Sequence, residues 1–524
     1  MISMKRAAAR LLALTVAVIA SSAHIGSPDV WLEGNAGPYP VVVNIQVPGV
    51  VPGIAQVYVR VTGDGIQQVS ASSNKFDATA GSPPPDIANP VDGDPGLYHL
   101  PLWIMTPGSN SVTVFVRGTR GAGKFLVPAV VVAHQRLIFS RPMALGLGAI
   151  GILLFFGAVS ILGAMSREAT LVPGTVPDRA YRRRARLVMV SSAIVLGVLL
   201  FGGWRWWNTE DMRFARTLYK PMDAHATVQT TNGVTSLDFS IVDSTWSFRH
   251  DTTWFKRNAN SLVAYRNASA LTPLVPDHGK LMHLFLIRDP DMTVFAHLHP
   301  TTTDSITFHT PIPALPAGHY HVYADIVLES GDAETMMTTV DIPNAGTTPN
   351  TTTTQAAAAS DPDNSWAMRP TSTTDTMTLT DGSVMHWDRG TTPLVVGHPA
   401  PLTFIVTDAA GHPATLEPYM GMAAHAVILR DDGAVFVHMH PTGTVPMGAQ
   451  ETFALRQKTD TVAGMIASRM QSNTMAGMTM PTTIIGDTVK FPYAFPKPGH
   501  YHLWVQIKHG GQILTGAFET QVGA

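Results

Sequence analysis

Residues 424–441 read AHAVILRDDGAVFVHMHP, and residues 282–300 read MHLFLIRDPDMTVFAHLHP. Each stretch has two short apolar runs joined by an Asp-containing turn, a pattern that is typical of an antiparallel β-hairpin. Downstream the copies match again, as PAGHYHVY at 316–323 and PGHYHLW at 498–504. The sequence therefore predicts two homologous β domains in tandem.

The position of each turn predicts which histidines face one another. In the second copy a hairpin centred in the turn 431–434 pairs His425 with His440, and His438 shares their face because it precedes His440 by two residues. The same argument groups three histidines of the first copy, His283, His297 and His299. Three neutral imidazoles on one strand pair suit copper or zinc, although histidines at such positions also serve packing or hydrogen bonding.

The rest of the chain extends the β prediction. The Pro-x-Gly-x-Tyr element of each copy resembles the approach to a late strand of an immunoglobulin-like sandwich, where a tyrosine packs at a corner. We expect the repeats to span 208–343 and 377–524, with the segment 344–376, rich in Thr, Asn and Ala, as a linker. Residues 24–137 contain alternating and β-branched runs that predict a further sandwich.

Three apolar segments predict membrane insertion. Residues 1–23 have the basic start, short apolar centre and small residues of a secretory signal, and cleavage after Ala23 would leave His24 as the N-terminus. The segments 142–165 and 187–204 are long enough to span a bilayer. Between them, the loop 166–186 carries six arginines and belongs in the cytoplasm by the positive-inside rule.

The predicted fold class is mainly β, with three immunoglobulin- or cupredoxin-like β-sandwich domains and a two-helix transmembrane hairpin. Both ends of the hairpin then lie outside the cytoplasm, which agrees with the signal peptide. We expect the bacterial inner membrane, with the bulk of the chain in the periplasm or outside.

The composition of the chain limits the kinds of metal ligand and catalytic group that it can offer. The 524 residues carry a net charge of −2, which does not suggest a general nucleic-acid binder, and they contain no cysteine. Disulfides, thiolate metal sites and cysteine nucleophiles are therefore excluded. Any metal must be held by other groups, and the chain has 21 histidines and 24 methionines.

A Met-rich insertion follows the second histidine motif. Its densest part contains Met475, Met478 and Met480 among small polar residues. Thioether sulfur favours Cu(I), whereas the alternative interpretation is an apolar flap of flexible packing residues. His24, as a mature N-terminus, would offer its amine and imidazole to one copper ion, although the second histidine of such a site is not evident.

Other polar residues near the motifs are weaker candidates. Four histidines share one face of the late strands and would complete the site only if those strands lay beside the hairpins: His319, His321, His500 and His502. Asp277 and Glu417 precede the first histidine of each copy and are candidate ligands or partners for an imidazole N–H.

The stretch 419–425, YMGMAAH, followed by HMHP at 438–441, resembles motifs of poorly characterised secreted bacterial domains similar to the YtkA-like and CopC-like copper-associated sandwiches. The resemblance covers roughly the last 150 residues and implies an immunoglobulin-like fold and metal handling. The layout also resembles the B subunit of particulate methane monooxygenase, but the His-x-His motif of that family's first domain is missing here. The analogy is one of layout only.

We therefore expect an extracytoplasmic metal-binding protein that handles copper, with zinc as an alternative, for storage, delivery or resistance, and with a metal donor or acceptor protein as a partner. The alternatives are a copper-dependent oxidase-like enzyme or subunit, and a structural surface protein without metal. The sequence contains no nucleotide-binding loop, Gly-x-Ser-x-Gly elbow or His-Glu-x-x-His helix, which weighs against hydrolases and NTPases.

Overall fold

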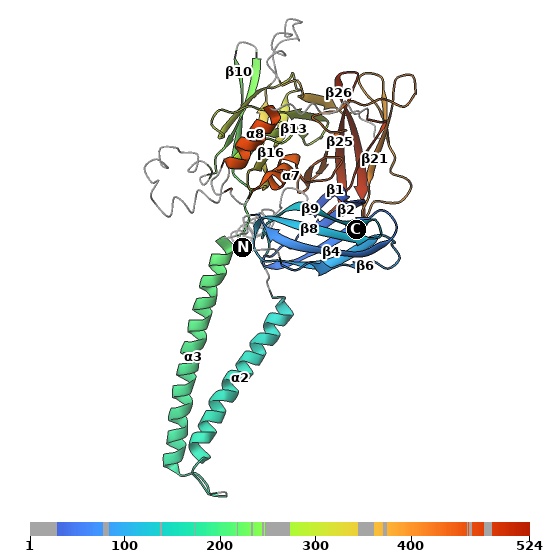
Figure 1. Ribbon diagram of the computed structural model, residues 1–524. Helices are drawn as coiled ribbons and strands as arrows, with labels where there is room; N and C mark the ends of the chain where they lie inside the picture. The colour runs from blue at the N-terminus through green and yellow to red at the C-terminus, as the bar shows by residue number, and fades with distance from the viewer. Residues whose placement is uncertain are drawn as a thin grey trace. The chain divides into compact units, whose positions relative to one another are not determined.

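The computed structural model describes residues 29–76, 83–136, 139–172, 174–216, 218–231, 234–243, 246, 273–343, 361–369, 375–457, 460, 464–475 and 485–524 (Figure 1). The predicted signal peptide, His24, Met478 and Met480 lie outside these residues. The chain divides into two compact units, one of residues 133–219 and one of residues 1–132 with 220–524.

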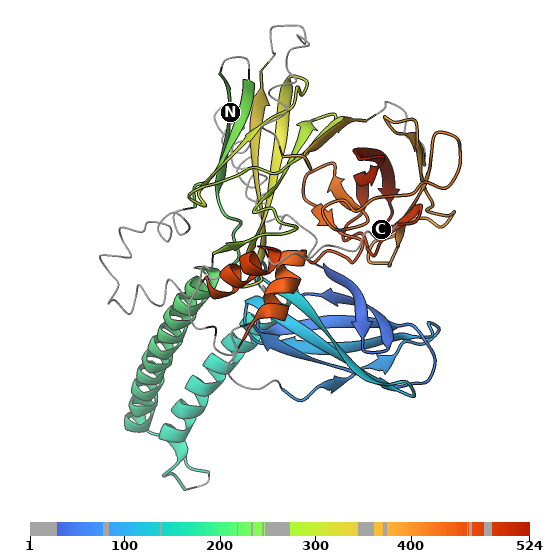
Figure 2. The same cartoon turned by 45° about the horizontal axis from the view of Figure 1, so that its top comes forward.

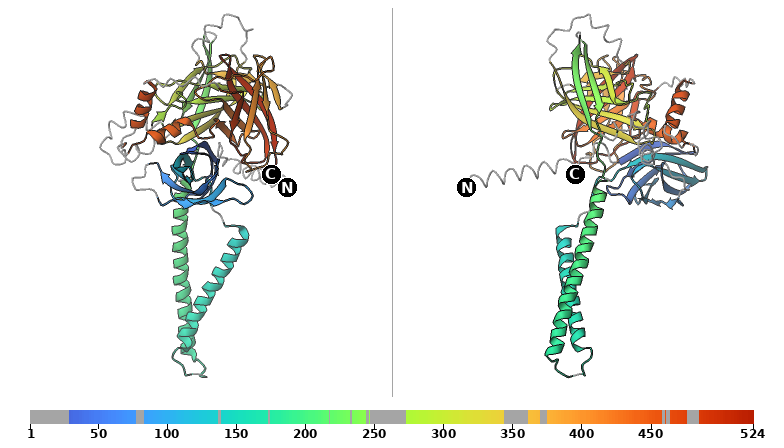
Figure 3. Two further views of the ribbon diagram at one scale, coloured as in Figure 1. Left: turned by 45° about the vertical axis from the view of Figure 1, so that its right-hand side comes forward. Right: turned by 90° about the vertical axis from the view of Figure 1, so that its left-hand side faces the viewer.

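The smaller unit is a helical hairpin of α2 (Arg141–Glu168) and α3 (Arg179–Arg216). Both helices are long and apolar enough to cross a membrane, with mean hydropathies of 2.4 and 2.2 over their most apolar stretches. They lie closest at the ends joined by the loop and diverge toward their other ends (Figure 3), and a Cβ on Gly163 would lie 2.5 Å from Cγ of Met189, so the helices approach closely at this glycine.

Part of the arginine-rich segment is helical. Helix α3 starts at Arg179, and the Asp178 carboxylate accepts hydrogen bonds from the backbone N–H groups of Ala180 and Tyr181 at 2.8 and 3.0 Å. A carboxylate at this position satisfies N–H groups that have no partner within the helix. The clustered arginines therefore occupy the first two turns of α3, ahead of its apolar stretch.

In the larger unit, the N-terminal sandwich pairs two antiparallel sheets. One has the order β1 (Asp29–Ala36), β2 (Tyr39–Gln46), β3 (Gly53–Val61), β7 (Leu97–Ile104), β6 (Asn89–Pro90), and the other β5 (Asp86–Ile87), β4 (Ile66–Lys75), β8 (Gly108–Gly118), β9 (Gly121–Val131). Alternate residues of β3 are buried, as expected for strands with one face on a core.

The first repeat has the same two-layer plan (Figure 2). Its smaller sheet has the order β10 (Ala224–Thr231), β11 (Val234–Ile241), β15 (Thr307–Pro311). Its larger sheet has the order β12 (Leu274–Val275), β16 (Gly318–Leu328), β13 (His283–Asp289), β14 (Val294–Leu298), β18 (Ser365–Met368), and β17 (Ala333–Ile342) also pairs with β16. Strand β18 comes from the segment expected to be a linker.

The second repeat pairs two four-stranded sheets. One has the order β19 (Thr376–Thr378), β20 (Val384–Trp387), β21 (Leu402–Thr407), β24 (Thr488–Phe491), and the other β23 (Phe436–Met439), β22 (His425–Arg430), β25 (Gly499–His509), β26 (Gln512–Val522). Its insertion forms α7 (Met447–Leu455) and α8 (Met465–Met475).

The predicted fold class is confirmed, since the chain is mainly β in antiparallel sheets with two long apolar helices. The tyrosine corner is present in both repeats. The Tyr320 hydroxyl donates to the Pro316 carbonyl at 2.6 Å, and the Tyr501 hydroxyl donates to the Lys497 carbonyl at 2.7 Å. Each tyrosine thus ties the start of β16 or β25 to the chain four residues earlier.

The two repeats share a buried apolar cluster formed by the outer faces of their hairpins. It contains residues of both repeats, among them Phe285, Ile287, Phe295, Tyr323, Val427, Leu429, Phe436 and Trp504. Phe295 stacks on Trp504 with ring centroids 5.0 Å apart, and Tyr323 stacks on Phe436 at 4.1 Å. Because these strands are buried on both faces, they read as nearly continuous apolar runs instead of alternating.

Phe436→Ala tests this interface. The ring is 1% exposed and stacks on Tyr323, so its removal leaves a cavity between the repeats and lowers the free energy of unfolding by about 3–5 kcal/mol. Denaturant unfolding of the detergent-solubilised chain, followed by tryptophan fluorescence, measures the loss. The control, Val234→Ala at a 40% exposed strand position, should change stability by less than about 0.5 kcal/mol. Equal effects of the two substitutions would show that the repeats do not depend on this contact.

Candidate metal centre

The strand registers are those expected from the sequence. Leu284 lies opposite Leu298, which places His283 across from His299, and Ala426 lies opposite Met439, which places His425 across from His440. Strand alternation then puts these histidines on the same face as the interface aromatics. Met439 points the other way, into the core of the second repeat, so this methionine is not a neighbour of the imidazoles.

The outer faces of the two hairpins bring six histidines together, and a seventh joins them from the turn that precedes β13; we call these seven the histidine cluster. Its members are His278, His283, His297, His299, His425, His438 and His440. Their side chains are buried, and even the most accessible one, His438, is only 6% exposed. Within the cluster two triads have ring nitrogens that all lie within 4.8 Å of one another.

The first triad consists of His283, His297 and His299, as the sequence predicts for a metal site. An outer nitrogen of each ring has an oxygen partner. His283 Nε2 donates to the Asp277 carbonyl at 3.2 Å, His297 Nδ1 to Gln506 Oε1 at 2.8 Å, and His299 Nδ1 to Asn364 Oδ1 at 3.0 Å. Partners of this kind fix the tautomer of a metal-ligating histidine.

Both amides present their oxygen atom to an imidazole. Gln506 Nε2 donates to the Ser365 hydroxyl, and Oε1 faces His297. Asn364 Oδ1 also accepts from the His299 backbone N–H at 2.7 Å, so this atom must be the oxygen. The outer nitrogens of the triad therefore carry the hydrogens, and in the neutral rings the inner nitrogens carry lone pairs.

Two of these inner nitrogens, His283 Nδ1 and His297 Nε2, are 3.0 Å apart. With the outer nitrogens protonated, these two atoms present lone pairs to each other, an arrangement that a cation bound by both would satisfy. The other neutral arrangement, in which His283 Nδ1 donates to His297 Nε2, gives up the hydrogen bond from His283 Nε2 to the Asp277 carbonyl. Burial lowers the pKa of His283, His297 and His299 well below the usual range, neighbouring imidazoles lower it further, and Lys280 adds to the lowering at His299, which disfavours a protonated ring. A metal ion fits the donor set, since it binds neutral imidazole lone pairs.

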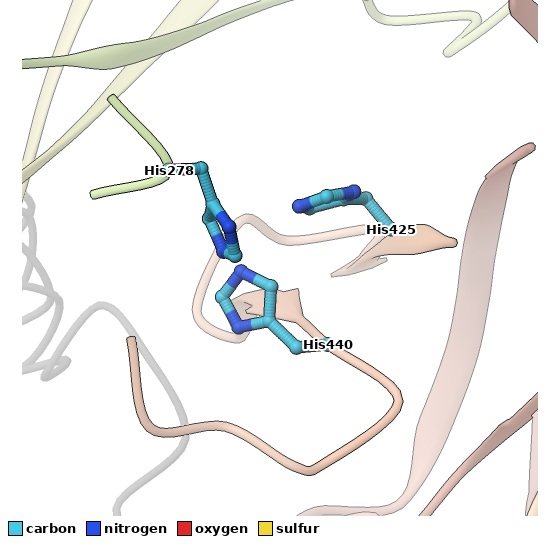
Figure 4. Close-up of side chains that lie close together, drawn as sticks. All are labelled: His278, His425 and His440. Carbon is cyan, nitrogen blue, oxygen red and sulfur yellow. The ribbon is translucent and has the colours of Figure 1, made fainter. Parts of the chain in front are cut away.

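The second triad is His278, His425 and His440 (Figure 4). Among the described residues, none of their six ring nitrogens has a hydrogen-bond partner of acceptable geometry. Burial lowers the pKa of His278, and the nearby backbone of Met420 partly opposes this lowering. Unpartnered buried polar atoms are costly, and a bound ion is one of the few ways to satisfy them.

Sequence reasoning missed His278, which the first repeat contributes to a triad of the second. The residue lies in the tight turn Asp277–Lys280 with φ of 52°, and Gly279 follows with φ of 79°. The second repeat has the same turn, with Met420 at 48° and Gly421 at 79°. A Gly four residues before the first histidine of each hairpin was the available signal, and it marks His278 and Met420 as equivalent positions.

His438 was expected to group with His425 and His440, and the structure places it between the two triads. Its ring centroid is 4.8 Å from that of His440 and 5.1 Å from that of His283. Nδ1 lies 3.4 Å from Asp325 Oδ2, whereas Nε2 has no partner among the described residues.

The remaining candidates lie elsewhere. Strands β16 and β25 do run beside the hairpins, but His321 and His502 are level with Ile287 and Leu429, near the turns and away from the cluster. His500 and the buried His502 form a separate group with the exposed Asp431. Met475 ends α8, and the structure does not describe its side chain.

The insertion reaches the first triad through Asp277. The carboxylate of this buried residue accepts a hydrogen bond from the backbone of Gly448, in the first turn of α7, at 2.7 Å. The Asp277 carbonyl simultaneously accepts from His283. The helices of the Met-rich insertion therefore begin beside the histidine cluster. Glu417, the other carboxylate candidate, instead accepts from Gly511.

Comparison with known proteins gives little functional information. Residues 243–344 and 377–524, just under half of the chain, match one protein family described as a domain of unknown function (DUF8832), so a single family model spans both repeats. No curated protein matches.

Solved structures are similar only at low TM-scores. A Salmonella alpha-2-macroglobulin mutant shares 9% identity over 94% of this chain and 23% of its own, with a TM-score of 0.21. Latent PorU from Porphyromonas gingivalis shares 9% identity over 95% of this chain and 34% of its own, with a TM-score of 0.13. A putative membrane anchored protein from Corynebacterium diphtheriae shares 8% identity over 94% of each chain, with a TM-score of 0.12. The chain thus spans well under half of the first two structures, and at these scores the likenesses carry no argument.

Gln506→Leu tests whether the oxygen partners support a metal ligand. Leucine removes the acceptor of the His297 Nδ1–H bond, so the ring loses its fixed tautomer and orientation, and metal affinity should fall about 10–100-fold. Competition with a chromophoric chelator measures the change. Gln512→Leu, at an exposed position of β26, is the matched control and should leave the affinity unchanged. An unchanged affinity in Gln506→Leu would mean that His297 does not ligate the ion.

Proposed function

We propose that the chain is a membrane-anchored, extracytoplasmic copper-binding protein whose metal site is the histidine cluster. The observation that carries the proposal is the close approach of His283 Nδ1 and His297 Nε2, 3.0 Å apart in a buried site. The other nitrogen of each ring has an oxygen partner, as the rings of metal-ligating histidines commonly do.

Three features favour copper. All-imidazole sites suit copper and zinc, whereas hard ions such as Mg²⁺ and Ca²⁺ take oxygen ligands. The insertion beside the cluster is rich in methionine, whose thioether suits Cu(I) and offers nothing to zinc. The chain has no cysteine, which fits an oxidising compartment where a thiolate site would be vulnerable.

The burial of the cluster favours binding over turnover. Five of the seven histidines are at most 3% exposed, so a bound ion is shielded from solvent on the side of the strands. We infer storage or delivery, with the Met-rich insertion as the segment that passes copper between the cluster and a partner. The insertion begins beside the cluster, at the Asp277–Gly448 contact, which supports this role.

The direct test is copper binding by the detergent-solubilised full chain and its His297→Leu variant. Leucine approximates the volume of the ring but offers no ligand, so we expect at least a 100-fold loss of Cu(I) affinity in chelator competition. His309→Leu is the matched control, because this half-exposed histidine pairs with Asp238 on the smaller sheet of the first repeat and is not a member of the cluster. Circular dichroism before and after heating verifies that both variants fold.

The outcomes separate the alternatives. Equal copper affinity of the parent chain and His297→Leu would contradict the proposal, as would the absence of copper binding. Tight zinc binding with weak copper binding would keep the site and assign it to zinc. Repeated oxidation of a reductant by the copper-loaded chain would favour an enzyme.

Membrane topology can be tested separately, because the chain has no native cysteine to interfere with labelling. Thr175→Cys lies between the two apolar helices, and Ala410→Cys lies on an exposed loop of the second repeat. In spheroplasts, a membrane-impermeant maleimide should label Ala410→Cys at once and Thr175→Cys only after lysis. The reverse pattern would place the repeats in the cytoplasm and contradict the proposed localisation.

A further inference from the structure

The two triads are immediate neighbours. The rings of His278 and His283 have centroids 6.2 Å apart, and those of His297 and His425 are 6.5 Å apart. Within one triad the ring centroids are 4.6–5.2 Å apart, so the separations between the triads are only moderately larger. Ions held by the two triads would therefore occupy adjacent positions within the buried histidine cluster.

The repeats meet with an approximate twofold relation that accounts for this pairing. Tyr323 and Trp504 occupy equivalent positions, each on the strand beside its own hairpin, level with Phe285 and Val427 respectively. Each stacks on the hairpin of the other repeat, Tyr323 on Phe436 and Trp504 on Phe295. In such an isologous contact, a site on one hairpin face must meet its counterpart on the other.

The number of ligands exceeds what one ion takes. A copper or zinc ion bound by imidazoles has about four ligands, and seven imidazoles converge here. The inner nitrogens also fall into two separate groups, each compact within 4.8 Å. The second group is completed across the interface by His278, so it exists only when the repeats are docked.

Charged groups beside the cluster suit more than one cation. The buried Asp277 carboxylate lies between the triads, with Oδ1 3.9 Å from His278 Nε2 and Oδ2 3.8 Å from His283 Nε2. Asp325 lies 3.4 Å from His438, the histidine that contacts both triads. Two carboxylates can offset the charge of two neighbouring Cu(I) ions. A cluster of neutral imidazoles alone would leave this charge uncompensated.

We propose that the histidine cluster holds a pair of copper ions, one in each triad, with His438 between them. This inference rests on the proposed copper binding and specifies its stoichiometry and arrangement. The first ion is held by His283, His297 and His299, and the second by His278, His425 and His440. His438 Nε2, without a partner among the described residues, is available to either ion.

Copper titration of the full chain, followed by electron paramagnetic resonance, tests the pair without any substitution. The first equivalent of Cu(II) should distribute over the two triads, so that most of the bound copper gives an electron paramagnetic resonance signal. The second should lower the spin count well below the copper content, because adjacent Cu(II) ions couple magnetically. Saturation should occur at two equivalents.

Substitutions then assign the ions. His299→Leu and His440→Leu should each bind one equivalent with its full spin count, and the double variant should bind none in the cluster. His309→Leu should behave as the parent chain, with two coupled ions.

Two results would overturn the pair. Saturation of the parent chain at one equivalent, lost in both single variants, would show one shared site and leave the copper-binding proposal standing. Two equivalents with a full, additive spin count would show two independent sites. Absence of copper from the parent chain would instead refute the proposed function itself.

Discussion

The packing of one hairpin face against another is the constraint on which the rest of the larger unit depends. Strands β13, β14, β22 and β23 bury one face in their own sandwich and the other against the opposite repeat. Near the turns this second face is aromatic and excludes water through the Phe295–Trp504 and Tyr323–Phe436 stacks. Toward the strand ends away from the turns, the same face carries imidazoles. These rings are therefore buried and cannot form hydrogen bonds with solvent.

This arrangement buries polar imidazole rings, and their burial determines which ligands the cluster can bind. A polar atom taken out of water without a partner costs about 1–3 kcal/mol, and several nitrogens of the cluster are in this state. Protonation offers no relief, because burial and neighbouring imidazoles hold the pKa values of His425 and His440 well below the usual range. The proposed coordination of metal ions would satisfy these nitrogens without adding a proton, and would account for the burial of so many histidines together.

Local sequence patterns were sufficient for the fold class and for much of the site. The turn positions set the hairpin registers, and the registers placed His283 across from His299 and His425 across from His440. Period-two alternation and the tyrosine corners followed from residues close in the chain. These features are determined within one supersecondary element, so one copy of the repeat is enough to infer them.

Features that depend on docking between the repeats were not accessible in the same way. His278 enters a triad with His425 from 147 positions earlier in the chain, and Gln506 orients His297 across 209 positions. Sequence alternation also put His438 in the second triad, whereas the twofold contact moves it between the two. No local period encodes such placements, because they follow from the relative orientation of two domains.

Anomalous diffraction from crystals of the copper-loaded chain, measured at the copper absorption edge, tests the central claim most directly. The account predicts anomalous density between the inner nitrogens of His283, His297 and His299, surrounded by imidazoles. Density at the separate group of Asp431, His500 and His502, or within the methionine-rich insertion, with none in the cluster, would contradict it.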